Sequence, residues 1–364
     1  MGREWGMELV ITEEQEALVE AVRQWLDATS ALEGARSGDP GRSRIRREGL
    51  GAAAAMGLLS LLRSGEGGTH ADLALVVEEV GRAATPLPIG QSALVCRALD
   101  DVGIAADTTA GIAEGKVIAV PAQPEPGEER VAGLEQADGT LSLSGRVPLV
   151  LGGLAAELFL VPAVAADGSH MLALVPAGAD GVSRTARTTL DLTRDFASVV
   201  LDGVRVPSGS WAKTAEDVVE AIADAVALHH AADAVGAADR LLEMTVQYVQ
   251  ERQQFGRAIG SFQAVKHHCA TMALDVECAR ITVRVAAQTL DSADRVARRT
   301  QVSSATSFAG EACSRVAGTA LQLHGGMGFT WEHDLHLLLR RVKTGELLGG
   351  SPRHHRARLF DLVA

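Results

Sequence analysis

The apolar positions in the first third of the chain repeat at helical spacing. Thr12-Glu-Glu-Gln15 has the form of a capping box, in which threonine and glutamine side chains bond the free amides at a helix start. Apolar residues continue on one helical face at Leu18, Val19, Val22 and Leu26. A further helix is predicted from Leu73 to Gly81, with the glycine ending it. Residues 1–115 are therefore predicted to form an N-terminal helical domain.

Between residues 116 and 207 the pattern changes to short apolar runs of the β type. Glycine, aspartate and proline separate these runs, and seven of the eleven prolines lie in this segment. The runs are Lys116–Val120, Thr140–Ser144, Glu157–Val161, Met171–Val175 and Ser198–Leu201. Their spacing predicts a small antiparallel sandwich or barrel. No run leads into a Gly-x-Gly-x-x-Gly turn and helix, which argues against a Rossmann domain.

Residues 208–364 are predicted to form a C-terminal four-helix bundle. Proline is absent from 208 to 351, and it costs about 3 kcal/mol inside a helix, so this stretch permits long helices. Helical faces recur from Val235 to Arg252 and from Phe262 to Ala279, and a third helix is expected over 294–324. The fold class is therefore α+β, mainly α, with three domains.

Composition and charge exclude several classes of protein. The 364 residues carry a net charge of -12, whereas nucleic-acid binding needs a basic face. The longest apolar stretch, 149–166, is broken by Glu157 and Pro162 and is too short to cross a membrane. Residues 1–20 are charged and lack the apolar core of a signal peptide. We therefore expect a soluble, cytoplasmic protein that binds neither membrane nor nucleic acid.

The cysteines and histidines do not predict a metal site. The four cysteines form no Cys-x-x-Cys pair, and we expect them to be reduced and mostly buried. The histidines at 229–230, 267–268 and 354–355 are adjacent in pairs. Helical neighbours diverge by about 100°, so the members of a pair cannot share a metal. We expect these histidines at solvent or at an interface.

Several motifs in the third segment carry a family resemblance. They are Arg252-Gln-Gln-Phe-Gly256, Phe262-Gln263 and Leu321-Gln-Leu-His-Gly-Gly-Met-Gly-Phe329. Weaker matches are Leu9–Gln15, Val77–Gly81 and Val199–Pro207. Each motif alone is weak, but in this order and at these separations they make the chain resemble the flavin-dependent acyl-CoA dehydrogenase family over nearly its whole length.

The resemblance implies a chemistry and a cofactor site. Members of this family remove the α proton of an acyl-CoA with a carboxylate, and flavin N5 takes the β hydride. FAD is shared across a subunit interface, so Arg252 would reach the pyrophosphate of the neighbour's FAD, with Phe255 beside the adenosine portion. The resemblance also implies amide hydrogen bonds to FAD from the side chains of Gln263 and Gln322. At Gly325 and Gly326 it implies that the backbone closely approaches the dinucleotide.

The catalytic glutamate of the family is missing at both of its known positions. Arg340 and Lys343 match the family, and the residue that then aligns with the base is Gly349. The alternative position, near the start of the helix before the Arg-x-x-Phe-Gly motif, is Val226. Asp224 is close in sequence, but two residues turn a helix by about 200°, so it faces away.

The β segment also departs from the family. A Thr-Glu-Pro stretch and an aromatic-Ile-Thr/Ser stretch usually contact the flavin, but this chain has Ala122–Pro126 and Val147–Gly152 there. The residues that cradle a flavin in the same subunit are lost, and those that reach a neighbour's flavin remain. This pattern resembles the glutamate-lacking subunit of bacterial α2β2 heterotetramers of steroid and lipid degradation.

The leading hypothesis is a non-catalytic subunit that completes the FAD site of a glutamate-bearing paralogue. The active complex would oxidise an acyl-CoA and pass electrons to electron-transfer flavoprotein. One alternative is a self-sufficient homo-oligomeric enzyme with a displaced base, for which Glu346 lies three residues, about 4.5 Å along a continuing helix, before Gly349. Another alternative is an acyl-CoA-binding scaffold without redox chemistry. The acyl group does not follow from the sequence.

Overall fold

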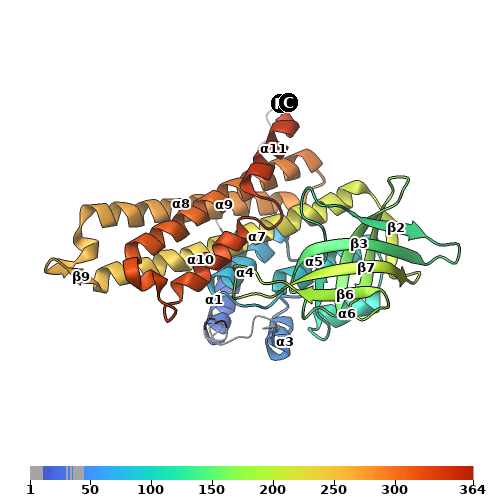
Figure 1. Ribbon diagram of the computed structural model, residues 1–364, viewed down its shortest axis with the longest axis horizontal. Coiled ribbons are helices and arrows are strands. Elements are labelled where there is room, and N and C mark those ends of the chain that lie inside the picture. Colours follow the sequence, from blue (N-terminus) through green and yellow to red (C-terminus); the bar gives the residue numbers. More distant parts are fainter. Residues whose placement is uncertain (1–10, 30–31, 33–34, 36–44, 364) are drawn as a thin grey trace.

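The chain folds mainly into helices, with one sheet formed by its middle segment. The computed structural model describes residues 11–29, 32, 35 and 45–363. Figure 1 shows a long bundle of helices, with the sheet packed at one end of it and the first helices against its middle. The predicted order of helices, sheet and helices is confirmed.

The first helices begin where local capping predicts. The helices of this part are α1 (Glu13–Asp27), α3 (Arg47–Ala55), α4 (His70–Arg82), α5 (Ile89–Val102) and α6 (Ala106–Ala113). In the capping box of α1, the Thr12 hydroxyl accepts from the Gln15 N–H, and the Gln15 side chain accepts from the Thr12 N–H. Residues 9–10, which open one of the weaker matches, lie outside the described residues.

Gly81 has a different role from the one predicted. The helix α4 continues through it to Arg82, so the glycine does not end the helix. A Cβ at Gly81 would lie 1.9 Å from the Asp233 carbonyl oxygen of α7 (Glu216–Glu251), and one at Gly236 would lie 1.8 Å from the Glu78 oxygen. Glycine is needed at both positions because the α4 and α7 backbones touch there.

The sheet contains the five predicted strands and three more. Its strands are β1 (Ala119–Pro121), β2 (Val131–Glu135), β3 (Leu141–Leu151), β4 (Leu158–Val164), β5 (His170–Pro176), β6 (Val182–Ala186), β7 (Phe196–Val206) and β8 (Trp211–Thr214). The sequence pattern missed β2, β6 and β8. They are short, and most residues of β6 are exposed, so they lack an apolar run.

Sheet pairing is mixed rather than purely antiparallel. The strand order is β6-β7-β3-β2-β4-β5-β8, with β1 beside β4. Both β1 and β2 pair parallel with β4, which corrects the prediction, and the other pairings of this sheet are antiparallel. Among the described strands the order runs openly from β6 to β8, so a closed barrel is not confirmed. The last strand lies beyond residue 207, so the sheet extends past the expected domain boundary.

Three long antiparallel helices form the centre of the C-terminal part. They are α7, α8 (Gln263–Leu290) and α9 (Arg295–His324), followed by α10 (Leu335–Gly345) and α11 (Pro352–Val363). A small hairpin of β9 (Gln253–Gln254) and β10 (Arg257–Ala258) and the 3-10 turn η1 (Ile259–Ser261) join α7 to α8. The 3-10 turn η2 (Gly325–Phe329) follows α9. The end of α7, the start of α8 and the end of α9 therefore meet at one end of the bundle (Figure 1).

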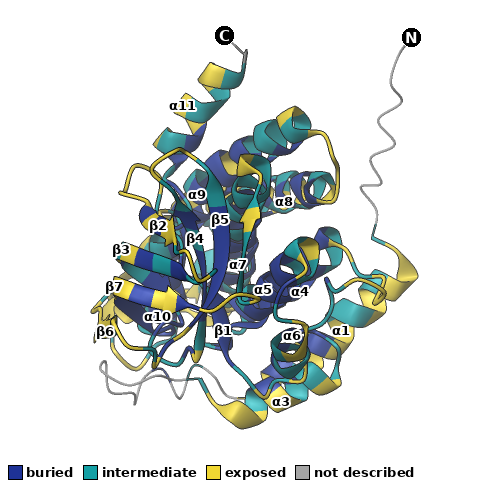
Figure 2. Cartoon of the chain, turned by 90° about the vertical axis from the view of Figure 1, so that its right-hand side faces the viewer, coloured by how far each residue is buried: buried dark blue, intermediate teal, exposed yellow. Residues whose placement is uncertain are grey.

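The most buried elements are those that lie between the sheet and the other helices. Figure 2 shows the helices α4, α5 and α7 and the inner strands mostly buried, whereas α1, α3 and the edge strand β6 carry exposed faces. In the described part of the chain, we find no helix with the length and apolar content needed to cross a membrane.

The α4–α7 contact makes a direct prediction about stability. Gly236→Ala should lower the free energy of unfolding by about 3 kcal/mol or more, because its Cβ would overlap the α4 backbone. Gly318→Ala in α9 is the matched control, since a Cβ there meets nothing within 4 Å. Alanine favours a helix over glycine by about 0.5–1 kcal/mol, so this variant should be slightly more stable. Urea unfolding of both variants checks this, and equal stability would contradict the contact.

Candidate functional site

Six residues from the sequence motifs lie at one end of the bundle. The C-terminal end of α7, the N-terminal end of α8 and the C-terminal end of α9 bring them together. Tyr248 of α7 stacks on His324 of α9, with ring centroids 4.4 Å apart, and this contact joins the two helix ends. We call these six residues the distal cluster. They are Arg252, Phe255, Gln263, Gln322, Gly325 and Gly326.

The hairpin in the distal cluster has a strained tip. Phe255 has a φ of 53° and Gly256 a φ of 77°, so both adopt left-handed backbone conformations. For a phenylalanine this conformation costs on the order of 1–3 kcal/mol. The Phe255 ring is nevertheless 92% exposed, with only an edge contact to Phe262 at 6.1 Å. A strained residue that projects its aromatic ring into solvent fits a contact with another molecule.

The other residues of the distal cluster are also exposed to solvent. Arg252, Gln263 and Gln322 are exposed, and no ion pair joins the Arg252 guanidinium to a described residue. A Cβ at Gly325 or Gly326 would meet nothing within 4 Å, so a ligand can approach this backbone. A free guanidinium, an aromatic ring, amide side chains and open glycine backbone fit the phosphates and rings of a dinucleotide such as FAD.

The position expected to hold a base is closed. Gly349 has a φ of 74°, and a Cβ there would lie 2.7 Å from the Ala227 Cα of α7. Its loop therefore packs directly on the helix, which leaves no room for a side chain. Ala227 and Glu251 lie 24 residues apart on α7, so Gly349 is roughly 36 Å along the helix from the distal cluster.

A carboxyl group from the β segment contacts the same loop. The Gly349 N–H donates to Glu125, with 2.9 Å between Gly349 N and Glu125 Oε2. Burial raises the pKa of Glu125 to about 7; the Gly349 N–H opposes this rise in part, and the Glu128 carboxylate adds to it. Glu125 and Gly349 both line a cleft of about 230 Å³ between the sheet and the start of α7. Sequence reasoning missed Glu125, whose only signal was an acidic residue between two prolines.

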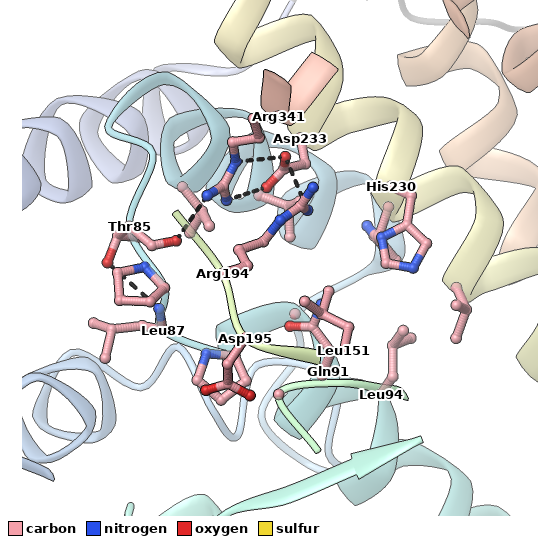
Figure 3. A pocket seen from close by; sticks show the side chains of 18 residues that line it. Thr85, Leu87, Gln91, Leu94, Leu151, Arg194, Asp195, His230, Asp233 and Arg341 are labelled. Atoms are coloured by element: carbon pink, nitrogen blue, oxygen red, sulfur yellow. Dashed lines mark hydrogen bonds and ion pairs between the residues drawn. The ribbon is translucent and has the colours of Figure 1, made fainter. Parts of the chain in front are cut away.

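The alternative base position lies beside a small cavity (Figure 3). Val226 lines this cavity, which has a volume of about 30 Å³, enough for about two water molecules. An acyl chain does not fit there. Asp224 does not line it and instead pairs with Arg298 and Arg358, as the helical rotation predicted.

A buried ion-pair cluster forms the polar wall of this cavity. The Arg341 guanidinium donates to both Asp233 oxygens, at 2.8 and 2.6 Å, and to the Thr85 carbonyl at 3.1 Å. Arg194 contacts Asp233 from the other side at 3.3 Å. Figure 3 shows the side chains of Arg341 and Arg194 converging on Asp233. The cluster is charge-balanced by Asp191, which pairs with Arg194 at 2.6 Å.

Three histidines expected at solvent or at an interface are buried. His229 and His230 line the small cavity, and His355 is only 1% exposed. Burial lowers the pKa of His230 and of His355 to about 4, so both are neutral at pH 7. A neutral imidazole is far less costly to bury than a charged one, and the helix pattern alone did not show which histidines other segments cover. No cluster of potential metal ligands occurs among the residues described in the structure.

Glu346 points away from the closed loop. Its carboxylate accepts a hydrogen bond from Ser314 of α9 and pairs with Lys343 at 3.3 Å. A Cβ at Gly310, also in α9, would lie 3.6 Å from the Glu346 side chain, so this side chain packs on α9. The cleft that Gly349 lines does not include Glu346. The structure therefore does not bring Glu346 to the base position.

Comparison with known proteins shows the family of this chain. A family model described as "Acyl-CoA dehydrogenase, C-terminal domain" matches residues 217–361. Acyl-CoA dehydrogenase IpdE2 of Mycolicibacterium smegmatis is 33% identical over 96% of this chain and 98% of that protein. The chain belongs to the acyl-CoA dehydrogenase family.

Two solved structures show which members of the family this chain resembles. A chain of the ChsE4-ChsE5 complex from Mycobacterium tuberculosis matches with a TM-score of 0.89 and 27% identity, over 98% of this chain and 99% of that chain. A variant of the Tcur3481-Tcur3483 steroid acyl-CoA dehydrogenase matches with a TM-score of 0.86 and 25% identity, over 96% and 98% of the two chains. Both are complexes of two different proteins, so the predicted resemblance to subunits of heteromeric acyl-CoA dehydrogenases is confirmed.

The buried carboxyl group makes stability depend on pH. The pKa of Glu125 rises from an ordinary value of 4.5 to about 7, so the folded state disfavours its ionised form. The contribution of the Glu125 carboxyl group to the free energy of unfolding is fully present below pH 4.5 and is lost as the pH rises through 7. Glu125→Gln should therefore gain melting temperature relative to the unmodified chain as the pH increases from 5 to 8. Thermal unfolding across this range checks the prediction, and a constant difference would contradict it.

Proposed function

We propose that this chain is an acyl-CoA dehydrogenase subunit that completes the FAD site of a glutamate-bearing partner. In this proposal the distal cluster contacts FAD seated mainly in the partner, and the partner supplies the base. The chain itself is non-catalytic. The resulting complex would dehydrogenate an acyl-CoA, with electron-transfer flavoprotein as the acceptor of its electrons.

The observation that carries the proposal is the contrast between the two ends of α7. At Gly349 the backbone packs on Ala227, so the chain has neither a base nor room for one. At the distal cluster, Arg252, Phe255 and the Gly325 backbone are exposed and ready for contact. The residues that would serve another subunit's cofactor are open, and the position that would serve this subunit's substrate is filled.

The contacts of the distal cluster suit a shared FAD. When bound, FAD supplies the acceptor for the substrate hydride, which side chains cannot provide. Arg252 would hold the pyrophosphate by charge and by its planar fork, and Phe255 would pack on the adenosine portion. Gln263 and Gln322 would donate or accept hydrogen bonds from their amides.

Exposed apolar side chains surround the distal cluster and favour a protein partner. Met327, Phe329 and Trp331 lie in or just after η2 and are exposed, as is Phe255 in the hairpin. An apolar group of this kind next to polar ligand contacts is typical of a subunit interface. The heteromeric complexes among its relatives support a paralogous subunit as the partner.

The alternatives have less support. A self-sufficient homo-oligomer with Glu346 as base needs that carboxylate in the cleft, but Lys343 and Ser314 hold it on α9. An acyl-CoA-binding scaffold has no observation of its own in its favour, since the guanidinium and aromatic ring at the distal cluster suit the pyrophosphate and adenine of FAD and of CoA alike. Both alternatives remain distinguishable by flavin content and turnover.

Co-expression tests the proposal directly. The chain purified alone should contain little flavin and show no turnover, because its own base position is closed. Co-expressed with a glutamate-bearing paralogue, it should give a yellow complex with one FAD per heterodimer. Visible absorbance and subunit stoichiometry measure this. Full flavin occupancy and turnover by the chain alone would overturn the proposal and favour the homo-oligomeric enzyme.

A single arginine tests the shared site. Arg252→Ala should weaken FAD retention by the complex by roughly 10–100-fold, because a charge-assisted contact with phosphate contributes about 1.5–3 kcal/mol. Arg252→Lys should have an FAD affinity between those of the unmodified complex and Arg252→Ala, since lysine keeps the charge but lacks the planar set of N–H donors of arginine. Arg353→Ala removes another exposed arginine and is the control. FAD titration of the apo-complex measures the affinities, and an unchanged affinity in Arg252→Ala would point to the scaffold instead.

A further inference from the structure

A two-residue turn sets the geometry of the hairpin between α7 and α8. Phe255 has a φ of 53° and Gly256 a φ of 77°, and two positive φ angles in succession define a type I′ turn. The turn joins Gln253–Gln254 to Arg257–Ala258, which pair antiparallel. Figure 1 shows this hairpin, labelled β9, at the tip of the bundle farthest from the sheet.

Two arginines lie on the same face of this hairpin. Directly opposite residues of an antiparallel pair carry their side chains on one face, and so do alternate residues of one strand. Arg257 is opposite Gln254, and Arg252 precedes Gln254 by two residues with extended backbone. The Ile259 N–H donates to the Arg252 carbonyl at 2.8 Å, which continues the pairing as far as Arg252. The two arginines are therefore diagonal neighbours, whose Cα atoms are typically about 7–8 Å apart.

An aromatic ring supports the Arg257 guanidinium. Its Cζ lies 4.1 Å from the centroid of the Phe262 ring, and this ring has an edge contact with Phe255 at 6.1 Å. Stacking on a ring fixes the plane of a guanidinium but uses none of its N–H donors. Arg252 and Arg257 are both exposed, and neither pairs with a side chain in the described part of the chain. Both guanidinium groups therefore keep donors for a ligand.

The charge around the hairpin is opposite to that of the whole chain. The net charge of the chain is -12, yet residues 252–274 contain no aspartate or glutamate. The same stretch carries the two arginines and Lys266, which is exposed one turn beyond Gln263 on α8 and on the same helical face. Cations without neighbouring carboxylates attract an anion that carries more than one charge.

We propose that Arg257 is a second phosphate-binding residue beside Arg252, and that the two arginines together hold the diphosphate of a dinucleotide. Each phosphate group of a diphosphate can accept hydrogen bonds from one guanidinium. A mononucleotide has one phosphate group and would use only one arginine. Arg257 would therefore make the site selective for dinucleotides. The assignment of FAD as this dinucleotide rests on the proposed function, whereas the two-arginine site does not.

ADP and AMP measure the contribution of the second arginine. ADP is the part that FAD and CoA share, and AMP has one phosphate group fewer. ADP should bind the full chain alone with a Kd on the order of 1 mM, and AMP should bind about 10-fold more weakly, because it lacks one charge-assisted contact. Arg257→Ala should weaken ADP binding by about 10-fold and leave AMP binding nearly unchanged, so that the two affinities converge. Phosphorus NMR titration measures both affinities.

Three variants make the test specific. Arg257→Lys keeps the charge but lacks the planar set of donors, so its ADP affinity should fall between those of the unmodified chain and Arg257→Ala. Gln253→Ala changes the opposite face of the hairpin, and Arg353→Ala removes an exposed arginine of α11. Neither control should alter the ratio of ADP to AMP affinity. The role of Arg257 is overturned if Arg257→Ala leaves this ratio unchanged, or if a control lowers it equally.

FAD and CoA identify the dinucleotide. Each is titrated separately onto the unmodified chain and onto Arg257→Ala. Tighter binding of FAD, lost in the variant, supports the shared FAD site. Tighter binding of CoA, lost in the same way, would keep the two-arginine site but contradict its proposed cofactor.

The test of Arg257 and the test of the proposed function can fail separately. The nucleotide titrations use the full chain alone, so a co-expression that gives no flavin complex leaves their result untouched. An unchanged ratio of ADP to AMP affinity in Arg257→Ala removes the second arginine and leaves the Arg252 contact with FAD in place. The two proposals are therefore distinguishable.

Discussion

The buried pair of Arg341 and Asp233 is the interaction on which the arrangement of the chain depends. Arg341 comes from α10, Asp233 from α7, the Thr85 carbonyl from the loop after α4, and Thr193 from the segment before β7. One fully buried guanidinium therefore ties the first helices, the β segment and the C-terminal helices together. Breaking a buried pair leaves an uncompensated charge, which typically costs about 3–5 kcal/mol, so these parts are held in one relative position.

This position determines the state of the cleft. With α10 held against α7, the loop that follows it must pass directly over the α7 backbone, where Gly349 meets Ala227. Glycine and a left-handed conformation satisfy that path, and a glutamate would not. The same path directs the Gly349 N–H at Glu125. The lack of room for a side chain at Gly349 and its contact with Glu125 are thus two consequences of one packing arrangement.

The two ends of α7 have opposite surroundings. Near Ala227 the helix is enclosed by α4, α10 and the sheet, and its glycine contacts with α4 leave no space. Near Glu251 it emerges into a strained hairpin with the exposed Phe255 at its tip. A long helix can separate a closely packed region from an exposed end that is free to contact another molecule. This separation is the physical basis of the proposal that the exposed end completes the FAD site of a partner subunit.

The sequence by itself determined the features that depend on residues close together along the chain. The capping box at Thr12, the five apolar strand runs and the long helices all follow from local spacing, and the structure agrees with them. The residues of the distal cluster were implied by the family resemblance, and their contact with FAD stays a prediction. Only the tertiary structure decided how Gly81 is used, which histidines are buried and where Glu125 lies. These depend on contacts between distant segments, such as the 224 residues that separate Glu125 from Gly349. Periodicity reports which face of an element is apolar, but it does not report which element covers that face, because many partners could bury it equally well.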